Sequence, residues 1–389
     1  MENNHIKVLI VGGGLQAVST ARSLKEEGFI VGCWCAKDNL AHKSSAIDIK
    51  GFSSDDESDS GNLINFIKQN TFDVAIPMND KYAIGLSQMK EELSQKTNCK
   101  IAVPDYSVLE IAANKVRLME LCQQYNFPHP QTISVDNCQS IEKEDLKFPL
   151  LIKPNHSVGA RGITRVNNYK ELQSALPNNL KHFGNCHLQE FIENARPYYN
   201  VMIYRDTHGK CINSVILEII RFFPLEGGSS SMCRTILNEE LTKLCMDVLG
   251  VLHYIGFADF DILKTQEGEY RIIEINPRVP ASLRGASISG INFPAIIVND
   301  LLGRKIESYV YSPRKILRFL GLDIMWFMTS NERFQCTPSW FKLIGKNIYY
   351  QEGGLKDLKP MLYSLFSNLK KIEFRDGKLR KKKDKFAYF

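Results

Sequence analysis

The sequence predicts an α/β fold, with a parallel sheet near the N-terminus and a mixed region after it. Three expected strands, Lys7–Val11, Phe29–Trp34 and Asp73–Pro77, alternate with expected helices, and strands that alternate with helices pair in a parallel sheet. From Phe148 onward the pattern changes to short strands interrupted by Gly and Asn. A chain of 389 residues exceeds an ordinary single core, so two or three domains are expected.

The composition is that of a globular protein. Hydrophobic residues make up 44% of the chain and charged residues 24%, which are ordinary shares for a globular domain. The first residues, Met1 to His5, are polar and lead directly into an expected strand, and no long uncharged apolar span occurs. A secretory signal or a membrane-spanning helix would need such a span, so we expect a cytoplasmic protein.

The ten cysteines show no metal-binding pattern in the sequence. Neither a Cys-x-x-Cys pair nor a Cys/His spacing typical of zinc sites is present. Cys33 and Cys35 are the closest pair, and their places on one face of an expected strand explain them without a disulfide. The sequence therefore predicts reduced thiols.

The net charge of +6 comes from the C-terminus. The segment Lys370–Phe389 holds nine Lys and Arg against three Asp and Glu, so the rest of the chain is neutral. A basic tail can attract nucleic acid or an anionic membrane surface. A solvated tail explains the same composition and is favoured, so we expect no nucleic-acid partner and leave contact with an anionic surface open.

A glycine loop follows the first expected strand. Gly12, Gly14 and Ala17 match the Gly-x-Gly-x-x-Gly/Ala spacing, in which amides at a helix N-terminus meet the phosphates of a dinucleotide. A dinucleotide site also needs an acidic residue at the end of the second strand, but that strand ends in Cys-Trp-Cys-Ala-Lys, with Asp38 rather late. A NAD-dependent oxidoreductase is therefore an alternative, and close packing of strand against helix explains the glycines equally well.

Two lysines and one loop are candidates for binding phosphates. Lys153 follows an apolar run and precedes Pro154, so its ammonium group leaves the end of an expected strand at a fixed place. The loop that follows, residues 155–162, contains Gly159, Arg161 and Gly162. Backbone amides of such a loop wrap phosphates at low steric cost. Lys115, in an expected helix, offers a second cation, although a single surface lysine is usually just solvated.

An expected β-hairpin, with strands 258–263 and 270–275, carries the strongest chemical pattern. Alternate residues of a strand share a face, so four oxygen-bearing side chains project in two pairs, Asp259 with Asp261 and Glu274 with Asn276. Across a hairpin these oxygens lie within a few ångströms of one another. Carboxylate and amide oxygens suit Mg²⁺, which takes its remaining ligands from substrate phosphates and water.

Arginines near this hairpin are candidates for contacting phosphate and substrate. Arg278 comes two residues after Asn276, and its permanent charge is placed to meet a transferring phosphoryl group. Arg284 lies six residues further on, and Arg234 follows a Gly- and Ser-rich loop that includes Ser229. Two arginines suit a substrate that bears a carboxylate, through bidentate pairing. Ordinary surface ion pairs explain Arg234 and Arg284 equally well.

In their order and spacing, these motifs resemble the ATP-grasp superfamily, specifically its carboxylate–amine ligases near the branch of the carbamoyl-phosphate-synthetase large subunit. The resemblance runs from about residue 6 to residue 305 and rests on six motifs in family order: Asn114-Lys115, Phe127–Thr132, Leu151–Pro154, Gly159–Gly162, Gln189–Ile192 and Glu274–Arg278. It implies a Rossmann-like N-terminal domain over 1–104 and a two-part α+β ATP-grasp domain over 105–305. A lid is implied at about 148–190, and residues 306–389 form a C-terminal extension with the basic tail.

The resemblance also implies a role for each candidate residue. Lys115 and Lys153 would hold phosphates, and the loop Gly159–Gly162 would close over them. Glu190, Phe191 and Ile192 would form a hinge whose backbone reads adenine. Magnesium, with manganese as a substitute, would be held by Asp261, Glu274 and Asn276; Asp261 is preferred to Asp259 because it fits the family spacing better.

One departure from the family pattern concerns the ribose of ATP. Similar proteins usually carry a ribose-binding glutamate shortly after the hinge, within a Gly-x-Glu pattern. In this sequence a proline, Pro197, takes that position, which leaves Glu193 as the candidate.

The implied activity is ATP- and Mg²⁺-dependent ligation. A small carboxylic acid, either an amino acid or a peptide, would be activated as an acyl phosphate and then attacked by an amine. Small-molecule substrates are thus the expected partners, and a homodimer is left open. Alternatives are another acyl-phosphate-forming enzyme of the same fold, the NAD-dependent oxidoreductase, and a binding protein that keeps the fold without catalysis.

Overall fold

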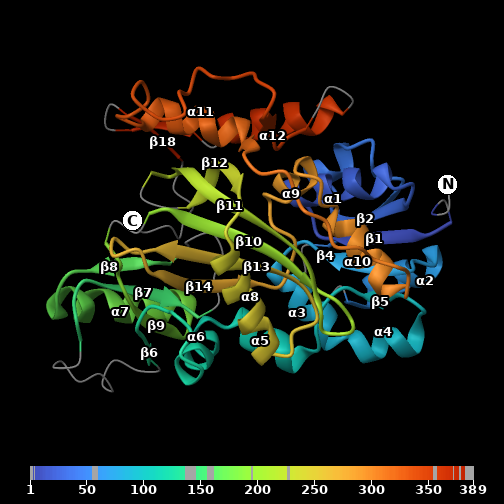
Figure 1. The fold of residues 1–389 in the computed structure, drawn as a ribbon, viewed down its shortest axis with the longest axis horizontal. Helices are drawn as coiled ribbons and strands as arrows, with labels where there is room; N and C mark the ends of the chain where they lie inside the picture. The colour runs from blue at the N-terminus through green and yellow to red at the C-terminus, as the bar shows by residue number, and fades with distance from the viewer. Residues whose placement is uncertain are drawn as a thin grey trace.

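The computed structural model of the protein describes most of the chain: residues 3, 5–54, 60–135, 146–155, 162–193, 196–225, 228–353, 357–370, 372–375 and 378–381. Three larger sheets organise these residues, and a two-stranded ribbon follows near the C-terminus (Figure 1).

The N-terminal sheet is parallel throughout, as the alternation of strands and helices predicts. Its order is β3-β2-β1-β4-β5, with strands β1 (Lys7–Val11), β2 (Ile30–Ala36), β3 (Ile49–Ser53), β4 (Val74–Pro77) and β5 (Lys100–Ile101). Its helical elements are α1 (Leu15–Glu26), the short 3₁₀ helix η1 (Leu40–Lys43), α2 (Ser60–Asn70), α3 (Asp80–Gln88) and α4 (Lys90–Lys96). The order, with β1 central, is that of a doubly wound sheet.

A small antiparallel sheet follows two helices, α5 (Tyr106–Ala113) and α6 (Lys115–Gln124). Its order is β6-β9-β7-β8, with β6 (Thr132–Val135), β7 (Leu150–Pro154), β8 (Thr164–Val166) and β9 (Cys186–Glu190). Helix α7 (Tyr169–Phe183) covers one face of this sheet and encloses a separate small core. The sheet begins at Thr132, so it extends N-terminal to the predicted lid boundary at about 148.

A seven-stranded sheet forms the largest part of the molecule, in the order β14-β13-β10-β11-β12-β15-β16. Its strands are β10 (Tyr198–Arg205), β11 (Cys211–Phe223), β12 (Ser229–Ile236), β13 (Gly256–Lys264), β14 (Tyr270–Asn276), β15 (Ile316–Arg318) and β16 (Ile348–Tyr350). Helix α8 (Glu239–Val251) covers one face. Residues of the other face share a core with the N-terminal sheet and with α9 (Arg284–Ile288) and α10 (Phe293–Leu301).

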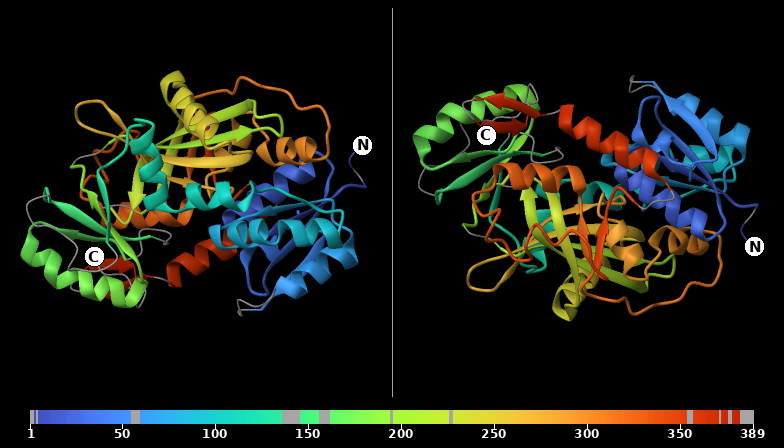
Figure 2. Two further views of the ribbon diagram at one scale, coloured as in Figure 1. Left: turned by 90° about the horizontal axis from the view of Figure 1, so that it is seen from below. Right: turned by 90° about the horizontal axis from the view of Figure 1, so that it is seen from above.

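The C-terminal residues contact both the seven-stranded sheet and the N-terminal region. Strands β15 and β16 continue the large sheet beyond the predicted domain boundary at residue 305, and α11 (Leu320–Thr329) packs on β11 and β12. Helix α12 (Leu358–Lys370) lies beside the N-terminal region (Figure 2) and contacts η1. Just before it, Asp357 pairs with Arg22 of α1 at 3.0 Å. The ribbon is formed by β17 (Ile372–Arg375) and β18 (Lys378–Lys381), and the end of the basic tail, 382–389, lies outside the described residues.

In the part of the chain that the structure describes, helices long and apolar enough to span a bilayer are absent.

Candidate active site

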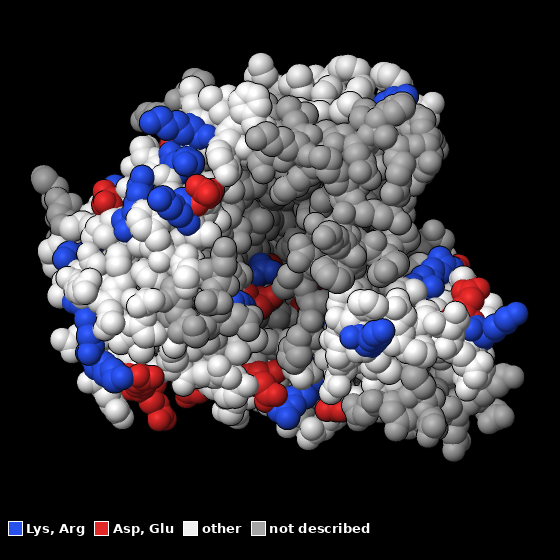
Figure 3. Space-filling model, turned by 180° about the vertical axis from the view of Figure 1, so that it is seen from behind, with Lys and Arg blue, Asp and Glu red and all other residues white. Residues whose placement is uncertain are grey.

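Strands β13 and β14 bring the predicted metal ligands onto one face. In the hairpin, Asp259 pairs with Asn276 and Asp261 pairs with Glu274. Residues directly opposite in an antiparallel pair share a face, so these four oxygen-bearing side chains gather together while Phe260 and its neighbours enter the core beneath α8. The surface is hollowed on the side shown in Figure 3, and charged side chains of both signs lie at the bottom of the hollow.

A neighbouring strand adds an amide that the sequence analysis missed. Asn200 of β10 lies opposite Asp261, and its Nδ2 donates a hydrogen bond to Asp261 Oδ1. Two residues earlier on the same face, Tyr198 is partly buried, and burial together with Asp261 raises the pKa of its phenol well above the ordinary value. The sequence signal was present: Asn200 is a polar residue in an otherwise apolar strand.

The two paired carboxylates have opposite titration behaviour. Burial, followed by the charges of Glu274 and Asp259, raises the pKa of Asp261 well above its ordinary value. Burial also opposes ionisation of Glu274, but Lys115, a hydrogen bond with Asp261 and the charge of Lys153 together outweigh it and hold the pKa of Glu274 down to about 2. Two adjacent carboxylates without a cation repel each other, and a divalent cation would relieve that repulsion. The donor set therefore fits Mg²⁺ or Mn²⁺.

Lys115 is positioned by a helix N-terminus. Asn114 caps α6, because its Oδ1 accepts hydrogen bonds from the backbone N–H groups of Val116 and Arg117. Lys115 is the first helical residue, and its Nζ lies 2.9 Å from Glu274 Oε2. The structure thus brings the predicted phosphate-binding lysine to the predicted metal site.

Lys153 approaches the same place from the small sheet. It lies on β7 with only 7% of its surface exposed, and its Nζ donates to Gln189 Oε1 at 2.5 Å. Burial, together with the charge of Lys115, lowers the pKa of Lys153 to about 8. A cation held out of water in this way has a strong electrostatic attraction for phosphate.

His187 of β9 is a further site residue that the sequence did not predict, and Gln189, the first residue of the motif Gln189–Ile192, also borders the site. They alternate with the buried Cys186 and Leu188, and His187 lies opposite Lys153. His187 Nδ1 and Asn155 Oδ1 are 3.0 Å apart, and its Nε2 has no hydrogen-bond partner among the described residues. Burial, then Lys153 and Lys115, lowers the pKa of His187 to about 3, so the imidazole is neutral.

The predicted phosphate loop is described only at its two ends, Asn155 and Gly162. Gly159 and Arg161 lie outside the described residues. Gly162 has a φ of +75°, and a Cβ at this position would come within 2.8 Å of Pro154 and 2.9 Å of Phe183. The loop therefore returns to the sheet through a position that only glycine fills without strain.

The predicted hinge leaves β9 and contacts two neighbouring segments. Glu190 exchanges hydrogen bonds with Gln131, through its backbone N–H at 2.8 Å and its side chain at 3.1 Å. The guanidinium of Arg165 lies 4.1 Å from the centre of the Phe191 ring, and the same group pairs with Glu193 at 3.2 Å. Ile192 lies between Phe191 and Glu193 in the sequence. Glu193, the candidate for ribose, is thus held by an exposed ion pair.

Arg278 links the metal-ligand face to the N-terminal sheet. Its Nε donates to Asp80 Oδ1 at 3.1 Å, and its Nη2 donates to Asn276 Oδ1 at 3.0 Å. Asp80 is the first residue of α3, directly after β4, where parallel sheets commonly bind ligands. Asp80 therefore fixes the orientation of the predicted catalytic arginine.

The predicted substrate residues are not brought to this cluster. Arg234 lies opposite Glu218 and pairs with it at 2.6 Å. The strand register puts that pair on the α8 side of the sheet, the reverse of the face that carries Asp261. Ser229 begins β12 at an exposed position. Arg284 lies among α1 and the C-terminal segment, where burial and then Arg22 lower its pKa.

The N-terminal glycine loop is filled by a side chain. Asn39 Oδ1 accepts hydrogen bonds from the backbone N–H groups of Gly14 and Ala41, each at 3.0 Å. A Cβ on Gly13 would lie 2.2 Å from Asn39, so the asparagine packs directly on the loop. These contacts occupy a loop amide that a dinucleotide phosphate would need, which favours the packing explanation for the glycines.

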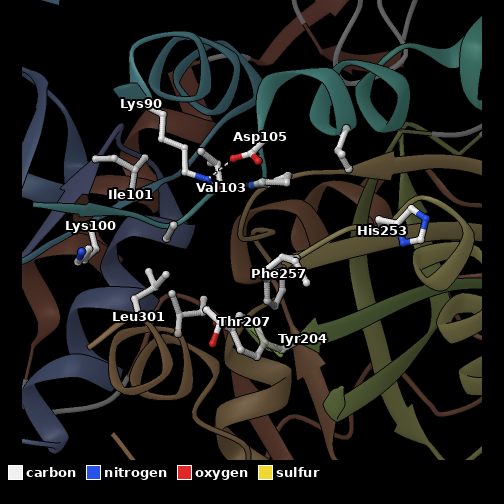
Figure 4. Close-up of a pocket in the computed structure, with 16 residues that line it drawn as sticks. Lys90, Lys100, Ile101, Val103, Asp105, Tyr204, Thr207, His253, Phe257 and Leu301 are labelled. Carbon is white, nitrogen blue, oxygen red and sulfur yellow. Dashed lines mark hydrogen bonds and ion pairs between the residues drawn. The ribbon is translucent and has the colours of Figure 1, made fainter. Parts of the chain in front are cut away.

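A separate cavity of about 270 Å³ lies where the N-terminal sheet meets the large sheet (Figure 4). Residues from β5, the start of α5, β10, β13 and α10 line it, and none of the predicted site residues is among them.

The comparisons with known proteins agree with this geometry. Residues 112–282 match the family described as ATP-grasp domain. This segment contains both lysines and the hairpin of β13 and β14. A D-aspartate ligase from Enterococcus faecium (strain Aus0004) is 26% identical over 251 residues, which are 59% of this chain and 59% of that protein. The N-terminal section of the carbamoyl phosphate synthase large chain from Methanopyrus kandleri is 26% identical over 185 residues, 45% of this chain and 32% of that protein.

A solved structure extends the likeness beyond the ATP-grasp domain. The biotin carboxylase domain of Hydrogenobacter thermophilus 2-oxoglutarate carboxylase, in complex with MgADP, has a TM-score of 0.67 at 16% identity and covers 80% of this chain and 73% of that one. The α/β fold class and the resemblance predicted from the sequence are thereby confirmed. The chain spans 59% and 32% of the lengths of the two curated relatives.

Proposed function

We propose that this protein is an ATP- and magnesium-dependent ligase, which activates a small carboxylic acid as an acyl phosphate and joins it to an amine. One observation carries the proposal: the buried Lys153 and the Lys115–Glu274 pair meet at the carboxylate face of β13 and β14. Cations for phosphate and oxygen ligands for a divalent metal are thus contributed to one site by three separate elements. The similarity to a D-aspartate ligase supports an amino acid as the acid or the amine.

In this proposal the two lysines bind the phosphates of ATP. Lys153 is already desolvated, and Lys115 is aimed from a helix N-terminus. Both ammonium groups are therefore placed before the nucleotide arrives, which limits reorganisation during phosphoryl transfer. His187 and Gln189 border Lys153 and would complete the polar lining of the nucleotide pocket.

Asp261, Glu274 and Asn276 would hold magnesium, which when bound neutralises phosphate charge and orients the phosphoryl group. Arg278 adds a permanent positive charge beside Asn276 Oδ1. We assign to Arg278 the stabilisation of the negative charge that develops as the phosphoryl group moves to the carboxylate. Its contact with Asp80 supports this role, because the guanidinium is held in one orientation.

Two observations bear on the alternatives. Asn39 occupies the glycine loop, which speaks against a NAD-dependent oxidoreductase. The biotin carboxylase likeness keeps another acyl-phosphate-forming enzyme as the second candidate, because carboxylation uses the same nucleotide site with bicarbonate as the acid. The cytoplasmic location, the homodimer and the role of the basic tail stay predictions.

Release of ADP tests the proposal. The protein is incubated with MgATP and a panel of amino acids, small acids and amines, and with bicarbonate as a separate arm. Lys153→Ala, Glu274→Ala and Arg278→Ala should each lower the rate by about 10²–10³-fold. Arg234→Ala is the matched control, since this arginine lies on the opposite face of the sheet, and it should keep the wild-type rate.

Wild-type rates in all three site variants would rule out the proposal. Stimulation by bicarbonate alone would replace ligation with carboxylation. A thermal shift with NADH that exceeds the shift with MgATP would favour the oxidoreductase.

A further inference from the structure

Two cysteines and a histidine meet at the C-terminal end of β2, outside the ATP-grasp domain. Cys33 and Cys35 alternate to one side of the strand, and His42 returns toward them from η1. The two Sγ atoms are 3.6 Å apart, and Cys35 Sγ lies 3.2 Å from His42 Nε2. One ligand atom of each residue lies within 4.8 Å of the others. No zinc-type spacing is visible in the sequence, because His42 reaches the cysteines only through the turn between β2 and η1.

The Cys33–Cys35–His42 cluster is buried. The exposed fractions of the three residues are 0%, 2% and 5%. The ring of Phe52 stands edge-on to His42 with centroids 5.1 Å apart, and Cys33 Sγ lies 3.7 Å from the carbonyl oxygen of Gly12. His42 Nδ1 is buried with no hydrogen-bond partner among the described residues.

Burial and hydrogen bonding shift the pKa values of two of these three side chains. Burial, as the largest cause, lowers the pKa of His42, which favours the neutral imidazole, whose lone pair can coordinate a metal. A hydrogen bond between Cys33 and Cys35, followed by burial, raises the pKa of the Cys33 thiol. A hydrogen-bonded row of thiols explains the same contacts without a metal, and metal titration distinguishes these two explanations.

We propose that Cys33, Cys35 and His42 bind one thiophilic d¹⁰ cation, Zn²⁺ or Cu⁺. Thiolate and imidazole select these ions over Mg²⁺, which requires oxygen ligands. On binding, each metal–sulfur bond replaces an S–H bond and the proton leaves to water, while Nε2 donates its lone pair to the metal. Tetrahedral Zn–S bonds of about 2.3 Å separate two sulfurs by about 3.8 Å, so the observed 3.6 Å needs little widening.

The number of protein ligands distinguishes a Cu⁺ site from a Zn²⁺ site. Three protein ligands match a trigonal Cu⁺ site, whereas Zn²⁺ would take a fourth ligand from outside the set. Both ions share the requirement for all three side chains. The site is distinct from the magnesium face, because β2 and η1 belong to the N-terminal sheet.

A bound ion here would fix the segment that anchors the C-terminal helix. Ser44 Oγ donates to Asp357 at 2.5 Å, directly after η1. Tyr363 of α12 donates from its hydroxyl to the carbonyl oxygen of Asp38 at 2.8 Å. Because both contacts flank the turn that brings His42 to the cysteines, metal binding should stabilise the docking of α12.

Metal titration of the full-length protein tests the proposal. Reduced, metal-free protein is titrated anaerobically with Zn²⁺, Cu⁺ and, as a spectroscopic probe, Co²⁺, with Mg²⁺ as the negative arm. We expect about one ion per chain, a thiolate-to-Co²⁺ charge-transfer band, and no displacement by MgATP. Competition with a zinc chelator and with a cuprous chelator identifies the preferred ion.

Variants locate the ligands. Cys35→Ser and His42→Gln should abolish stoichiometric binding and the band. Cys99→Ser is the matched control: Cys99 is also buried, with an exposed fraction of 4%, and burial raises its pKa to about 12, but it lies outside the cluster. Absence of binding in the wild-type protein, or an unchanged band in both cluster variants, overturns the proposal.

A second measurement needs no variant. Zn²⁺ or Cu⁺ should protect Cys33 and Cys35 from an alkylating reagent while the protein is partly unfolded, and peptide mass spectrometry reads the labelling at each cysteine. Protection confined to these two thiols supports the site. Equal labelling of all cysteines with and without metal contradicts it.

Discussion

Arg278 and Asp80 join the hairpin region to the first residue of α3 in the N-terminal region: Arg278 Nε donates to Asp80 Oδ1 at 3.1 Å. The side chains are 20% and 25% exposed, so the pair is only partly screened by water. Because Arg278 also donates to Asn276, the first residue of α3 controls the geometry of a predicted metal ligand. The N-terminal sheet thus has a role in the candidate site besides packing.

Asp80→Asn should lower the rate of ADP release by about 10- to 100-fold, the usual effect of losing a residue that orients a ligand. The amide keeps the size of Asp80 but removes the charge that holds the guanidinium. The KM for ATP should change little, since Lys115 pairs with Glu274 and Lys153 with Gln189. Steady-state kinetics with varied ATP separates the two parameters.

Asp105→Asn provides the control for charge alone. Asp105 also pairs with a cation, Lys90, but its side chain is 79% exposed, and such pairs contribute little. Equal rate losses in both variants would show that Asp80 has no special role in positioning Arg278.

Lys153→Met should separate stability from activity. The folded protein lowers the pKa of Lys153 from 10.5 to about 8, which corresponds to an unfavourable free energy of about 3 kcal/mol for the charged form. Methionine removes this cost but leaves Gln189 without its partner, so the free energy of unfolding without ligand should rise by about 1–2 kcal/mol. ADP release should nevertheless be lost. Chemical denaturation and the activity assay check the two parts.

The pH dependence of stability gives the sign of this effect. With a lowered pKa, the folded protein binds fewer protons at Lys153 than the unfolded chain between pH 8 and 10.5. The cost of the buried charge is therefore fully present below pH 8 and is relieved as pH rises through this window. Wild-type protein should lose its deficit relative to Lys153→Met between these pH values. A difference between the two proteins that is constant with pH would contradict the assigned cause.

The hairpin shows which parts of the site the sequence could predict. Its strands, its turn and the shared face of Asp261, Glu274 and Asn276 all follow from alternation over two adjacent segments. The face occupied by Arg234 could not be obtained in this way, because it depends on register accumulated across β10, β11 and β12. One shifted position turns a side chain to the other side of a sheet.

That residues of distant strands meet at the site could not be predicted from the sequence either. Asn200, His187 and Gln189 are polar residues on strands that otherwise enter the core, and this alternation is visible in the sequence. Nothing local indicates that β10 lies beside β13 or that β9 lies beside β7. Similarly, His42 joins the cysteines only because a turn of a few residues folds back.

Asp261→Asn should raise stability without ligand and abolish the effect of metal. Repulsion from Glu274 and Asp259 contributes to the raised pKa of Asp261, and the amide removes that repulsion, which we expect to be worth about 1 kcal/mol. The rise in Tm that MgATP produces in the wild-type protein should largely disappear. Asp259→Asn is the matched comparison on the same face, and it should keep the magnesium-dependent shift. If only Asp259→Asn loses that shift, the metal ligand is Asp259.

Gly162→Ala should destabilise the small sheet and impair nucleotide binding, even though glycine contributes no chemical group. A methyl group at Gly162 meets Pro154 and Phe183 at under 3 Å, and the backbone φ of +75° is unfavourable for alanine. Together these effects should lower the free energy of unfolding by at least about 1–2 kcal/mol. Pro154 directly follows Lys153, so any shift that accommodates the methyl group displaces the buried ammonium and should raise the KM for ATP.

Gly85→Ala is the control, because Gly85 lies in α3 with nothing within 4 Å of an added Cβ, and it should stabilise the protein by about 0.5–1 kcal/mol. Denaturation curves of both variants, with ATP affinity measured at a temperature where each is folded, decide the matter: an unchanged ATP affinity in a destabilised Gly162→Ala would show that the loop end does not position Lys153.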